Sequence, residues 1–474
     1  MGKRTLARNI SYNIINQIIA LIVPLISAPY VARIFNAELI GSYSYVLANS
    51  SYFVLLENLG FTLYGQIKIA SVQDDLGERS RIFKEIYTLK WILMIISLIL
   101  YGFVILSIDG TLTKRLGAIM FLNIIANGID VTWFFNGLEL FKTTAVRNII
   151  VRVISLIFVL LLVKNAEDIY LYAIIMQGAT LSAYLLVLPL VKKYIVFNGS
   201  KNLCLKKHIK PALVYFIPGL VTTIFSSTDK TMLGTMCSNY EVGVYEQANK
   251  IAQICMGAIS AIGNVLMPRA TYLYHHENNS DNANNLLYKS LKIVLFISVP
   301  VAFGISAISD EFIPFFFGPG YEKSSFLLNI LSFNVAFTAW SNLIGQQCLI
   351  SRDKQGKYNK AVIISAILNV IFNFFLIKGF QSEGAAHASV VASIGNLAMI
   401  IWMCRDELCI KKIFKGLFKY MLASIIMYIV VRKICYWKAG TVYSLFVHIL
   451  IGIVIYMLTV QIINFLKCGE KNDI

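Results

Sequence analysis

Charged residues are scarce in this sequence. They make up 14% of the 474 residues, whereas hydrophobic residues make up 57%. The chain has 25 acidic and 42 basic side chains. A soluble domain carries about a quarter of charged residues, so the composition excludes an ordinary soluble enzyme or binding module. The composition and a mean hydropathy of +0.69 predict an all-α integral membrane protein with many spanning helices joined by short loops.

Signatures of catalysis and metal binding are also missing. The eight cysteines follow no regular spacing, so neither a disulfide framework nor a zinc site is indicated. No phosphate-binding loop with its lysine is present, so an ATP-driven pump would need a separate subunit. The outer loops are too short for a membrane glycosyltransferase or polymerase. We therefore predict that the chain is not an enzyme, has no catalytic or metal-binding residue, and needs no cofactor beyond a coupled H⁺ or Na⁺ ion.

Long apolar runs follow one another from about residue 10 to about residue 466. A spanning helix needs roughly 20 mainly apolar residues, and on that rule the chain has about fourteen spans. The runs near 39–64 and 324–350 are the least apolar of the set. A twelve-span interpretation therefore stays open.

The basic residues predict the orientation of these spans. If both termini are cytoplasmic, roughly 28 Lys and Arg lie on the inner side and roughly 9 on the outer side. The net charge of +17 is then mainly a topology signal, and no nucleic-acid partner is expected. The predicted location is the cell membrane, with both termini in the cytoplasm.

The sequence also contains a faint internal repeat. "ELIGSY" at 38–43 resembles "YEVGVY" at 240–245, an offset of about six spans. An even offset gives two six-helix bundles of the same orientation, which we place at residues 1–204 and 205–404. Two additional spans occupy residues 405–474. Transporters built from repeats place the substrate between the halves.

Several motifs resemble those of one known family. They are "PLISAPYVARIFNAELIGSY", "TDKTMLGTMCSNYEVGVYEQANKIAQ", "FFFGPGYEKSSFLLNIL" and "GAAHASVVASIG". Their order and spacing resemble the polysaccharide-unit flippases of the multidrug/oligosaccharidyl-lipid/polysaccharide exporter superfamily. The resemblance implies two bundles in a V shape, alternating access, and an isoprenoid-diphosphate-linked oligosaccharide moved from the inner to the outer leaflet. It also implies that the last two helices flank a groove suited to the lipid tail.

Basic residues within the apolar runs are the candidates for binding the diphosphate. An ionisable side chain at mid-bilayer costs about 2.5–3.5 kcal/mol, so it normally faces protein or water. Lys230, Lys250 and Arg33 would supply a cationic cavity for the headgroup. The alternatives are snorkelling of Lys230 to the outer surface, an intrahelical pair of Lys250 with Glu246, and interfacial anchoring by Arg33.

Three intramembrane acids are candidates for ion coupling: Glu57, Asp130 and Asp229. Each could carry a coupling proton or sodium ion. Alternatively, Glu57 and Asp130 are structural partners of nearby basic residues, and Asp229 is a counter-charge beside Lys230. We expect Lys90, Arg152 and Lys292, which lie near cytoplasmic helix ends, to snorkel to the interface.

These observations favour a flippase for lipid-linked polysaccharide units. A flippase for a teichoic-acid or peptidoglycan precursor differs only in the sugars of its cargo. A cation-coupled multidrug exporter of the same superfamily is a further alternative. The expected partners are the lipid-diphosphate-linked oligosaccharide and membrane lipids. A polysaccharide polymerase or other assembly proteins are further expected partners.

Overall fold

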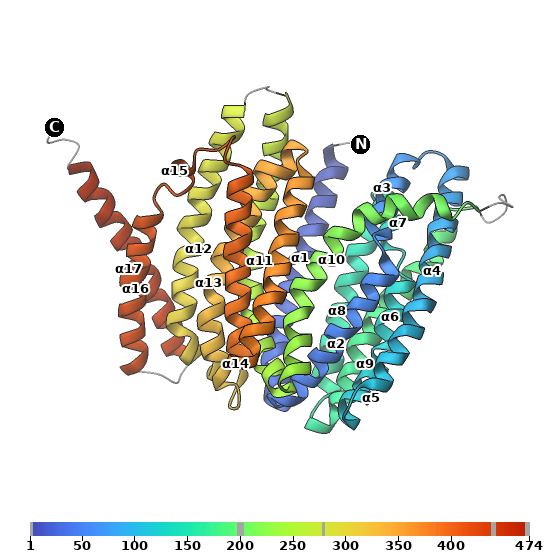
Figure 1. The fold of residues 1–474 in the computed structure, drawn as a ribbon, viewed down its shortest axis with the longest axis horizontal. Helices are drawn as coiled ribbons and strands as arrows, with labels where there is room; N and C mark the ends of the chain where they lie inside the picture. The colour runs from blue at the N-terminus through green and yellow to red at the C-terminus, as the bar shows by residue number, and fades with distance from the viewer. Residues whose placement is uncertain (1–2, 197–202, 277–279, 438–441, 470–474) are drawn as a thin grey trace. The chain divides into compact units, whose positions relative to one another are not determined.

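A computed structural model describes residues 3–196, 203–276, 280–437 and 442–469. Within these ranges all regular elements are helical, as the sequence predicts (Figure 1). The chain divides into two compact units, Met1–Gly234 and Thr235–Ile474. Each unit is described separately.

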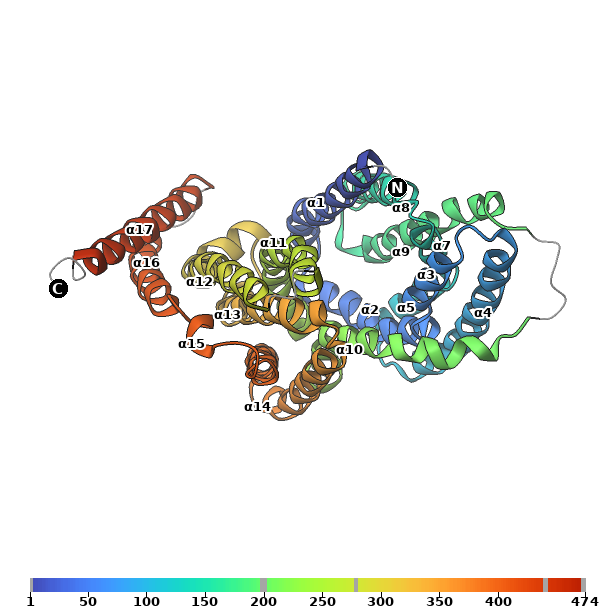
Figure 2. The same ribbon diagram turned by 90° about the horizontal axis from the view of Figure 1, so that it is seen from above.

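Unit 1 contains long helices and three short ones that together form a broken span. Its elements are α1 (Lys3–Ile34), α2 (Ala37–Asn58), α3 (Phe61–Ser71), α4 (Leu76–Ser107), α5 (Thr111–Ile119), α6 (Phe121–Gly128), α7 (Thr132–Gly137), α8 (Phe141–Leu162), η1 (Ala166–Asp168), α9 (Ile169–Val187), η2 (Leu188–Lys193) and nearly all of α10 (Lys206–Met236). Seen along the helices in Figure 2, α1 lies beside α8, and the two helices are in contact.

Unit 2 contains the remaining helices. They are α11 (Asn239–His276), α12 (Ser280–Phe317), α13 (Glu322–Ile344), the short turns η3 (Gly345–Leu349) and η4 (Ile350–Arg352), α14 (Gln355–Met403), α15 (Ile410–Ile413), α16 (Leu417–Trp437) and α17 (Val442–Gly469). Helices α16 and α17 pack on each other and on α12.

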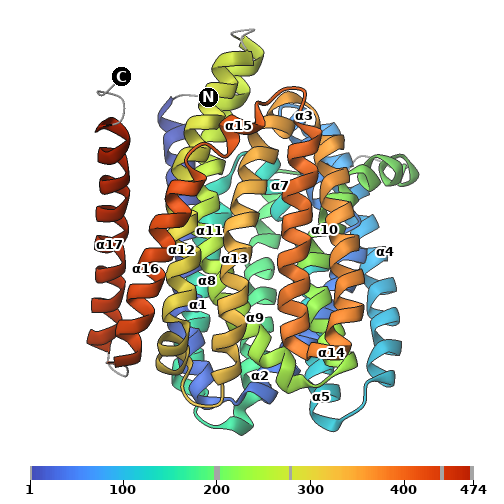
Figure 3. The ribbon, with the colours of Figure 1, turned by 60° about the vertical axis from the view of Figure 1, so that its left-hand side comes forward.

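The described residues contain 13 helical segments long and apolar enough to cross a membrane. One of them, α14, has 49 residues and is interrupted at Gln381, whose φ of 51° and ψ of −128° are not helical. At 1.5 Å per residue, α14 is about 74 Å long, far more than one crossing requires. Figure 3 shows its two limbs side by side, and Ser365 on one limb donates a hydrogen bond to the carbonyl of Ala392 on the other. Counted as two spans, α14 accounts for the predicted fourteen.

The second span is also broken. It runs through α2 and α3, with Leu59 (φ 40°) and Gly60 (φ 82°) at the break. A Cβ on Gly60 would lie 2.2 Å from the carbonyl oxygen of Ala212 on α10. Glycine therefore allows both the left-handed backbone and the close crossing of α10.

Side chains are distributed as expected of helices surrounded by lipid. On α4, Phe103 and Leu106 are exposed while Ser97 is buried. Because lipid is as apolar as leucine, apolar residues on the outer face cost nothing, and the interior is free to hold small polar residues.

The boundary between the two compact units lies at 234/235, about 30 residues beyond the predicted domain boundary at 204/205. The start of α10 packs within unit 1, where His208 and Ala212 are buried. The assignment of residues 1–204, 205–404 and 405–474 to two bundles and an appendage remains a prediction.

Candidate functional site

Lys90 is a buried cation within unit 1. It lies on α4 with 1% of its surface exposed. Its Nζ donates hydrogen bonds to the carbonyl oxygens of Asn127 (3.2 Å) and Asp130 (3.1 Å). The Asn127 carbonyl lies in the last turn of α6, and the Asp130 carbonyl lies in the break between α6 and α7. The C-terminal end of a helix favours a cation, because the helix dipole is negative there. The expectation that Lys90 snorkels is wrong, because the break after α6 offers the ammonium group acceptors inside the protein.

Asp130 and, to a smaller extent, Glu57 on α2 are the acids whose charges act on Lys90. The Glu57 side chain is 1% exposed, and neither carboxylate oxygen has a hydrogen-bond partner among the described residues. The charges that act on it are Lys90 and Asp130. A buried carboxylate without donors is costly when ionised, so binding a proton or a small cation would relieve it.

Asp130 has a structural role at the start of α7. Its Oδ1 accepts a hydrogen bond from the backbone NH of Thr132 at 2.8 Å and another from the Thr132 hydroxyl. Arg147 of α8 donates to the same hydroxyl at 3.3 Å and lies over the ring of Tyr184 at 5.2 Å. The structure therefore brings Glu57 and Asp130, two of the predicted coupling acids, to one buried charged cluster.

Arg147 was missed by the sequence reasoning. It lies at the start of an apolar run, where a basic residue resembles an interfacial anchor, and only its burial shows otherwise. Arg152, one turn further along α8, donates to the carbonyl oxygen of Asn16 on α1 at 3.2 Å. It therefore links two helices of unit 1 and does not act only as an anchor.

The other predicted site residues are distributed over both units. In unit 1, Asp229 and Lys230 lie on α10, buried and half-buried respectively, and Arg33 is exposed near the end of α1. In unit 2, Lys250 on α11 is half-buried and donates to Gln247 at 3.3 Å. Their roles in a cationic cavity stay predictions.

A second buried polar cluster joins three helices of unit 2. Glu311 on α12 accepts a hydrogen bond from the Ser444 hydroxyl of α17, and His448 Nδ1 of α17 lies 2.7 Å from Glu311 Oε2. Cys435 Sγ of α16 lies 3.4 Å from the same nitrogen. The cluster fixes α16 and α17 to α12. The isolated histidine in "LFVHILIGIV" was the signal that could have found it.

The Glu311, Cys435 and His448 ligand atoms all lie within 4.8 Å of one another, a donor set that zinc accepts. The 2.7 Å separation of His448 and Glu311 is that of a hydrogen bond. The cluster is therefore explained without a metal ion.

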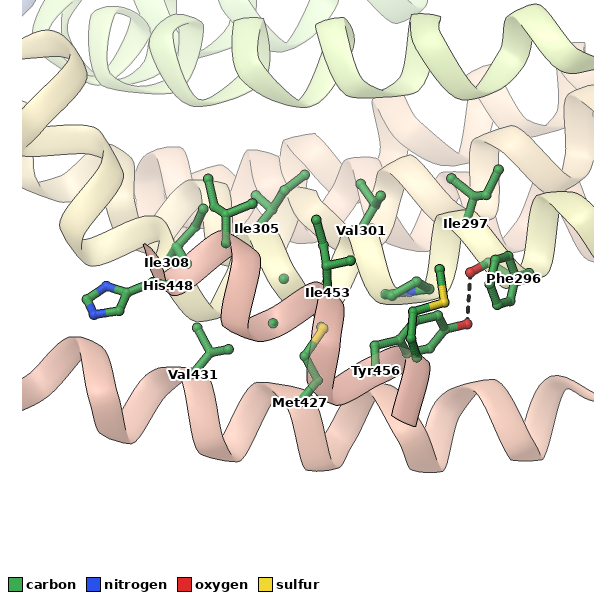
Figure 4. A pocket seen from close by; sticks show the side chains of 15 residues that line it. Phe296, Ile297, Val301, Ile305, Ile308, Met427, Val431, His448, Ile453 and Tyr456 are labelled. Carbon is green, nitrogen blue, oxygen red and sulfur yellow. Dashed lines mark hydrogen bonds between the residues drawn. The ribbon is translucent and has the colours of Figure 1, made fainter. Parts of the chain in front are cut away.

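An apolar groove runs along the same three helices (Figure 4). It has a volume of about 360 Å³. Its lining is almost wholly apolar: Phe296, Ile297, Pro300, Val301, Gly304, Ile305, Ile308, Met427, Val431, His448, Ile449, Gly452, Ile453, Tyr456 and Met457. Tyr456 donates its hydroxyl to the carbonyl oxygen of Phe296 at 2.8 Å, the bond drawn at one end of the groove in Figure 4. The lining suits a hydrocarbon chain.

The sequence is similar to known proteins over most of its length. A sequence profile described as "Polysaccharide biosynthesis protein" matches residues 6–274. The chain is 24% identical over 389 residues to a protein of Escherichia coli (strain K12) named "Putative O-antigen transporter", covering 81% of this chain and 93% of that protein.

Two solved structures have a similar fold. The lipid II flippase MurJ in its inward closed conformation has a TM-score of 0.75 at 16% identity, covering 96% of this chain and 98% of the other. A multidrug resistance MATE family transporter of the MOP superfamily, in an inward-facing conformation, has a TM-score of 0.58 at 13% identity, covering 83% and 94%. At these identities the likeness bears on fold alone, and it confirms the predicted all-helical membrane architecture.

Proposed function

Because this chain belongs to the polysaccharide biosynthesis protein family, we propose that it is a flippase for isoprenoid-diphosphate-linked oligosaccharide units. It moves these units from the inner to the outer leaflet by alternating access, for cell-surface polysaccharide biosynthesis. The observation that carries the proposal is the alignment over 93% of the Escherichia coli protein named as an O-antigen transporter. It agrees with the resemblance to polysaccharide-unit flippases drawn from the sequence motifs.

The physical problem for such a protein is the charge of the diphosphate. Moving an ionised group through hydrocarbon is costly unless the protein supplies compensating charges. Lys230, Lys250 and Arg33 are the basic residues proposed for this role. Charge-assisted hydrogen bonds from ammonium and guanidinium groups to phosphate oxygens are among the strongest available to a side chain.

Ion coupling is proposed for the buried cluster of unit 1. Glu57 has no hydrogen-bond donor among the described residues, so its carboxylate gains more from H⁺ or Na⁺ than a solvated one does. Asp130 already accepts a hydrogen bond from the backbone NH of Thr132 at the start of α7. Glu57 is therefore the stronger candidate for ion coupling. Asp229, buried on α10, is the third.

The protein is a multi-pass membrane protein, and its relatives are transporters. We place it in the cell membrane with both termini cytoplasmic, on the distribution of basic residues. The ends of the chain, 1–2 and 470–474, lie outside the described residues. Neither an enzymatic activity nor a cofactor is proposed, and a polysaccharide polymerase is the proposed partner that receives the flipped units.

Two other functions share this fold. A precursor of teichoic acid or peptidoglycan is the runner-up cargo, and a cation-coupled multidrug exporter is the third candidate. The similar solved structures show only that the fold is shared with such proteins. Cargo chemistry separates the three, because only the first two are lipid-linked diphosphates.

Leaflet-specific labelling of lipid-linked oligosaccharide in cells depleted of the protein tests the proposal. The expected result is accumulation of the lipid on the inner face, restored by the wild-type gene. Normal outer exposure combined with altered drug tolerance would replace the proposal with the exporter. Accumulation of a cell-wall precursor alone would assign the runner-up cargo.

A further inference from the structure

A second cavity lies in unit 1, between the start of α8 and the segment where α9 continues into η2. This α8–α9 pocket has a volume of about 450 Å³. Two cations and a hydroxyl group line it together with apolar side chains, among them Lys142, Arg147, Thr143, Ile150, Leu186 and Leu190. No acidic residue of the described chain lines it. Cations beside an apolar wall suit an anion that also carries hydrocarbon.

The pocket lies at the depth of the lipid headgroups, on the side that the basic residues assign to the cytoplasm. Lys142 precedes Leu162, the last residue of α8, by about 20 residues, or about 30 Å at 1.5 Å per residue. This length equals the usual thickness of the hydrocarbon core, about 30 Å. Arg147 lies about 8 Å deeper. Ile150 is 48% exposed and Leu186 62% exposed, so a lipid of the inner leaflet can reach the pocket from the side.

Arg147 is the buried cation of the pocket. It is 7% exposed, and among the described residues its guanidinium group forms no ion pair with a carboxylate. Its Nε and Nη2 donate to Asn148 Oδ1 at 3.1 and 2.7 Å, and its Nη1 and Nη2 donate to the Thr132 hydroxyl at 3.3 and 3.4 Å. These bonds fix the side chain and leave one of the two Nη1 hydrogens without a partner in the described part of the chain. An anion in the pocket would compensate this buried charge.

A lipid phosphate is the anion that fits this position. Arginine held in one orientation binds phosphate oxygens with directed hydrogen bonds, and Lys142 adds a second charge at the membrane surface. The inner leaflet offers phosphates at the depth of Lys142. A soluble anion would leave water for a pocket walled by Ile150, Leu186 and Leu190, which is costly. An acyl chain next to the phosphate contacts the same apolar wall favourably.

We propose that the α8–α9 pocket binds the phosphate of an anionic phospholipid of the inner leaflet, with Arg147 and Lys142 as its cations. The site goes beyond the proposed function and does not depend on the identity of the cargo. The Thr132 hydroxyl accepts from Arg147 and donates to Asp130. One hydroxyl group therefore separates the cation that holds the lipid from the buried charged cluster that contains Glu57.

Binding of phosphatidylglycerol to the full-length protein in detergent micelles, followed by mass spectrometry of the intact complex, tests the two cations. Lys142→Gln removes one charge, and Arg147→Lys keeps the charge but loses the planar guanidinium group. The control Lys192→Gln removes an exposed lysine of η2 that does not line the pocket. We expect the dissociation constant to rise roughly fivefold or more in each pocket variant and to stay unchanged in the control. An equal rise in the control, or no rise in the pocket variants, would overturn the site.

Thermal unfolding in nanodiscs separates lost binding from lost folding. A ligand that binds only the native state stabilises it, so the wild type should unfold at a higher temperature in phosphatidylglycerol than in phosphatidylcholine. Lys142 is exposed, so Lys142→Gln should unfold like the wild type in phosphatidylcholine and gain less from phosphatidylglycerol. The control Lys192→Gln should keep the full gain. A gain that is the same in both variants would contradict the site.

Three other ligands test the assignment to an anionic phospholipid. Phosphatidylcholine has no net charge and should bind weakly, and inorganic phosphate has no acyl chain and should not displace phosphatidylglycerol. Undecaprenyl phosphate should bind no more tightly than phosphatidylglycerol. Equal binding of phosphatidylcholine, displacement by inorganic phosphate, or tighter binding of undecaprenyl phosphate would each overturn the inference, in favour of an ordinary lipid contact, a soluble-anion site or a cargo site. Leaflet-specific labelling tests the proposed function separately.

Discussion

Lys90 illustrates how a buried charge is accommodated at the scale of one residue. Two of its three ammonium donors bond to the carbonyls of Asn127 in α6 and of Asp130 just after it, and Asp130 and Glu57 supply opposite charges nearby. Removing one member of a buried pair leaves the other uncompensated, which costs more than the pair contributes.

Replacement of Lys90 by methionine should therefore lower the free energy of unfolding by about 3–5 kcal/mol. The double variant Lys90→Met/Glu57→Gln should recover part of that loss, because the glutamine carries no buried charge while Asp130 remains. Thermal unfolding of the purified variants in detergent measures both effects. Losses that simply add would show that Lys90 and Glu57 do not interact.

Lys230→Gln tests the proposed cationic residue most sharply. Glutamine retains hydrogen bonding and removes the charge, so transport of the lipid-linked unit should be abolished while membrane insertion stays intact. Lys114→Gln, at an exposed position on α5, serves as the control and should transport normally. Unchanged transport in Lys230→Gln would remove that residue from the site.

At the scale of helices, hydrogen bonds between charged side chains hold the segments that connect the helices in place. Glu407 follows α14 and accepts hydrogen bonds from Arg352, at 2.8 Å, and from Lys354. Although burial raises the pKa of its carboxyl group, these two bonds and charges outweigh burial and lower the pKa below its ordinary value.

A lowered pKa in the folded state adds stability above the unfolded pKa of about 4.3, and this stability is lost as the pH falls through the lowered value. The unfolding temperature of the wild type should fall in that acidic range, and Glu407→Gln should lack this part of the pH dependence. At neutral pH the variant should lose about 1–3 kcal/mol, because Arg352 is buried and loses a partner. Identical pH profiles would contradict the role given to Glu407.

The breaks within spans also depend on single residues. Gly60→Ala places a methyl group 2.2 Å from the Ala212 carbonyl oxygen in a left-handed backbone, and we expect a loss of about 1–3 kcal/mol. Gly178→Ala on α9 meets no atom within 4 Å and should be neutral or stabilising. Thermal unfolding compares the two, and equal stability would show that the close crossing is relaxed.

At the scale of the molecule, the spans were predictable because a bilayer imposes the same length on each helix. The interruptions were not, since Leu59 and Gln381 adopt positive φ values that their residue types do not announce. Contacts between residues far apart in the sequence could not be predicted either. Glu311 and His448 are 137 residues apart in sequence, and no local pattern connects them. Lys90 was misread because sequence alone does not show where a neighbouring helix ends.

The transport claim is tested most directly with purified protein in vesicles. Undecaprenyl-diphosphate-linked oligosaccharide is incorporated in both leaflets, and an added glycosidase that cannot cross the membrane removes the outer sugars. With the protein present, cleavage should proceed beyond the outer half to nearly all of the lipid, and it should slow sharply with Lys230→Gln. Cleavage that stops at the outer half, with correctly folded protein in the vesicles, would contradict the account.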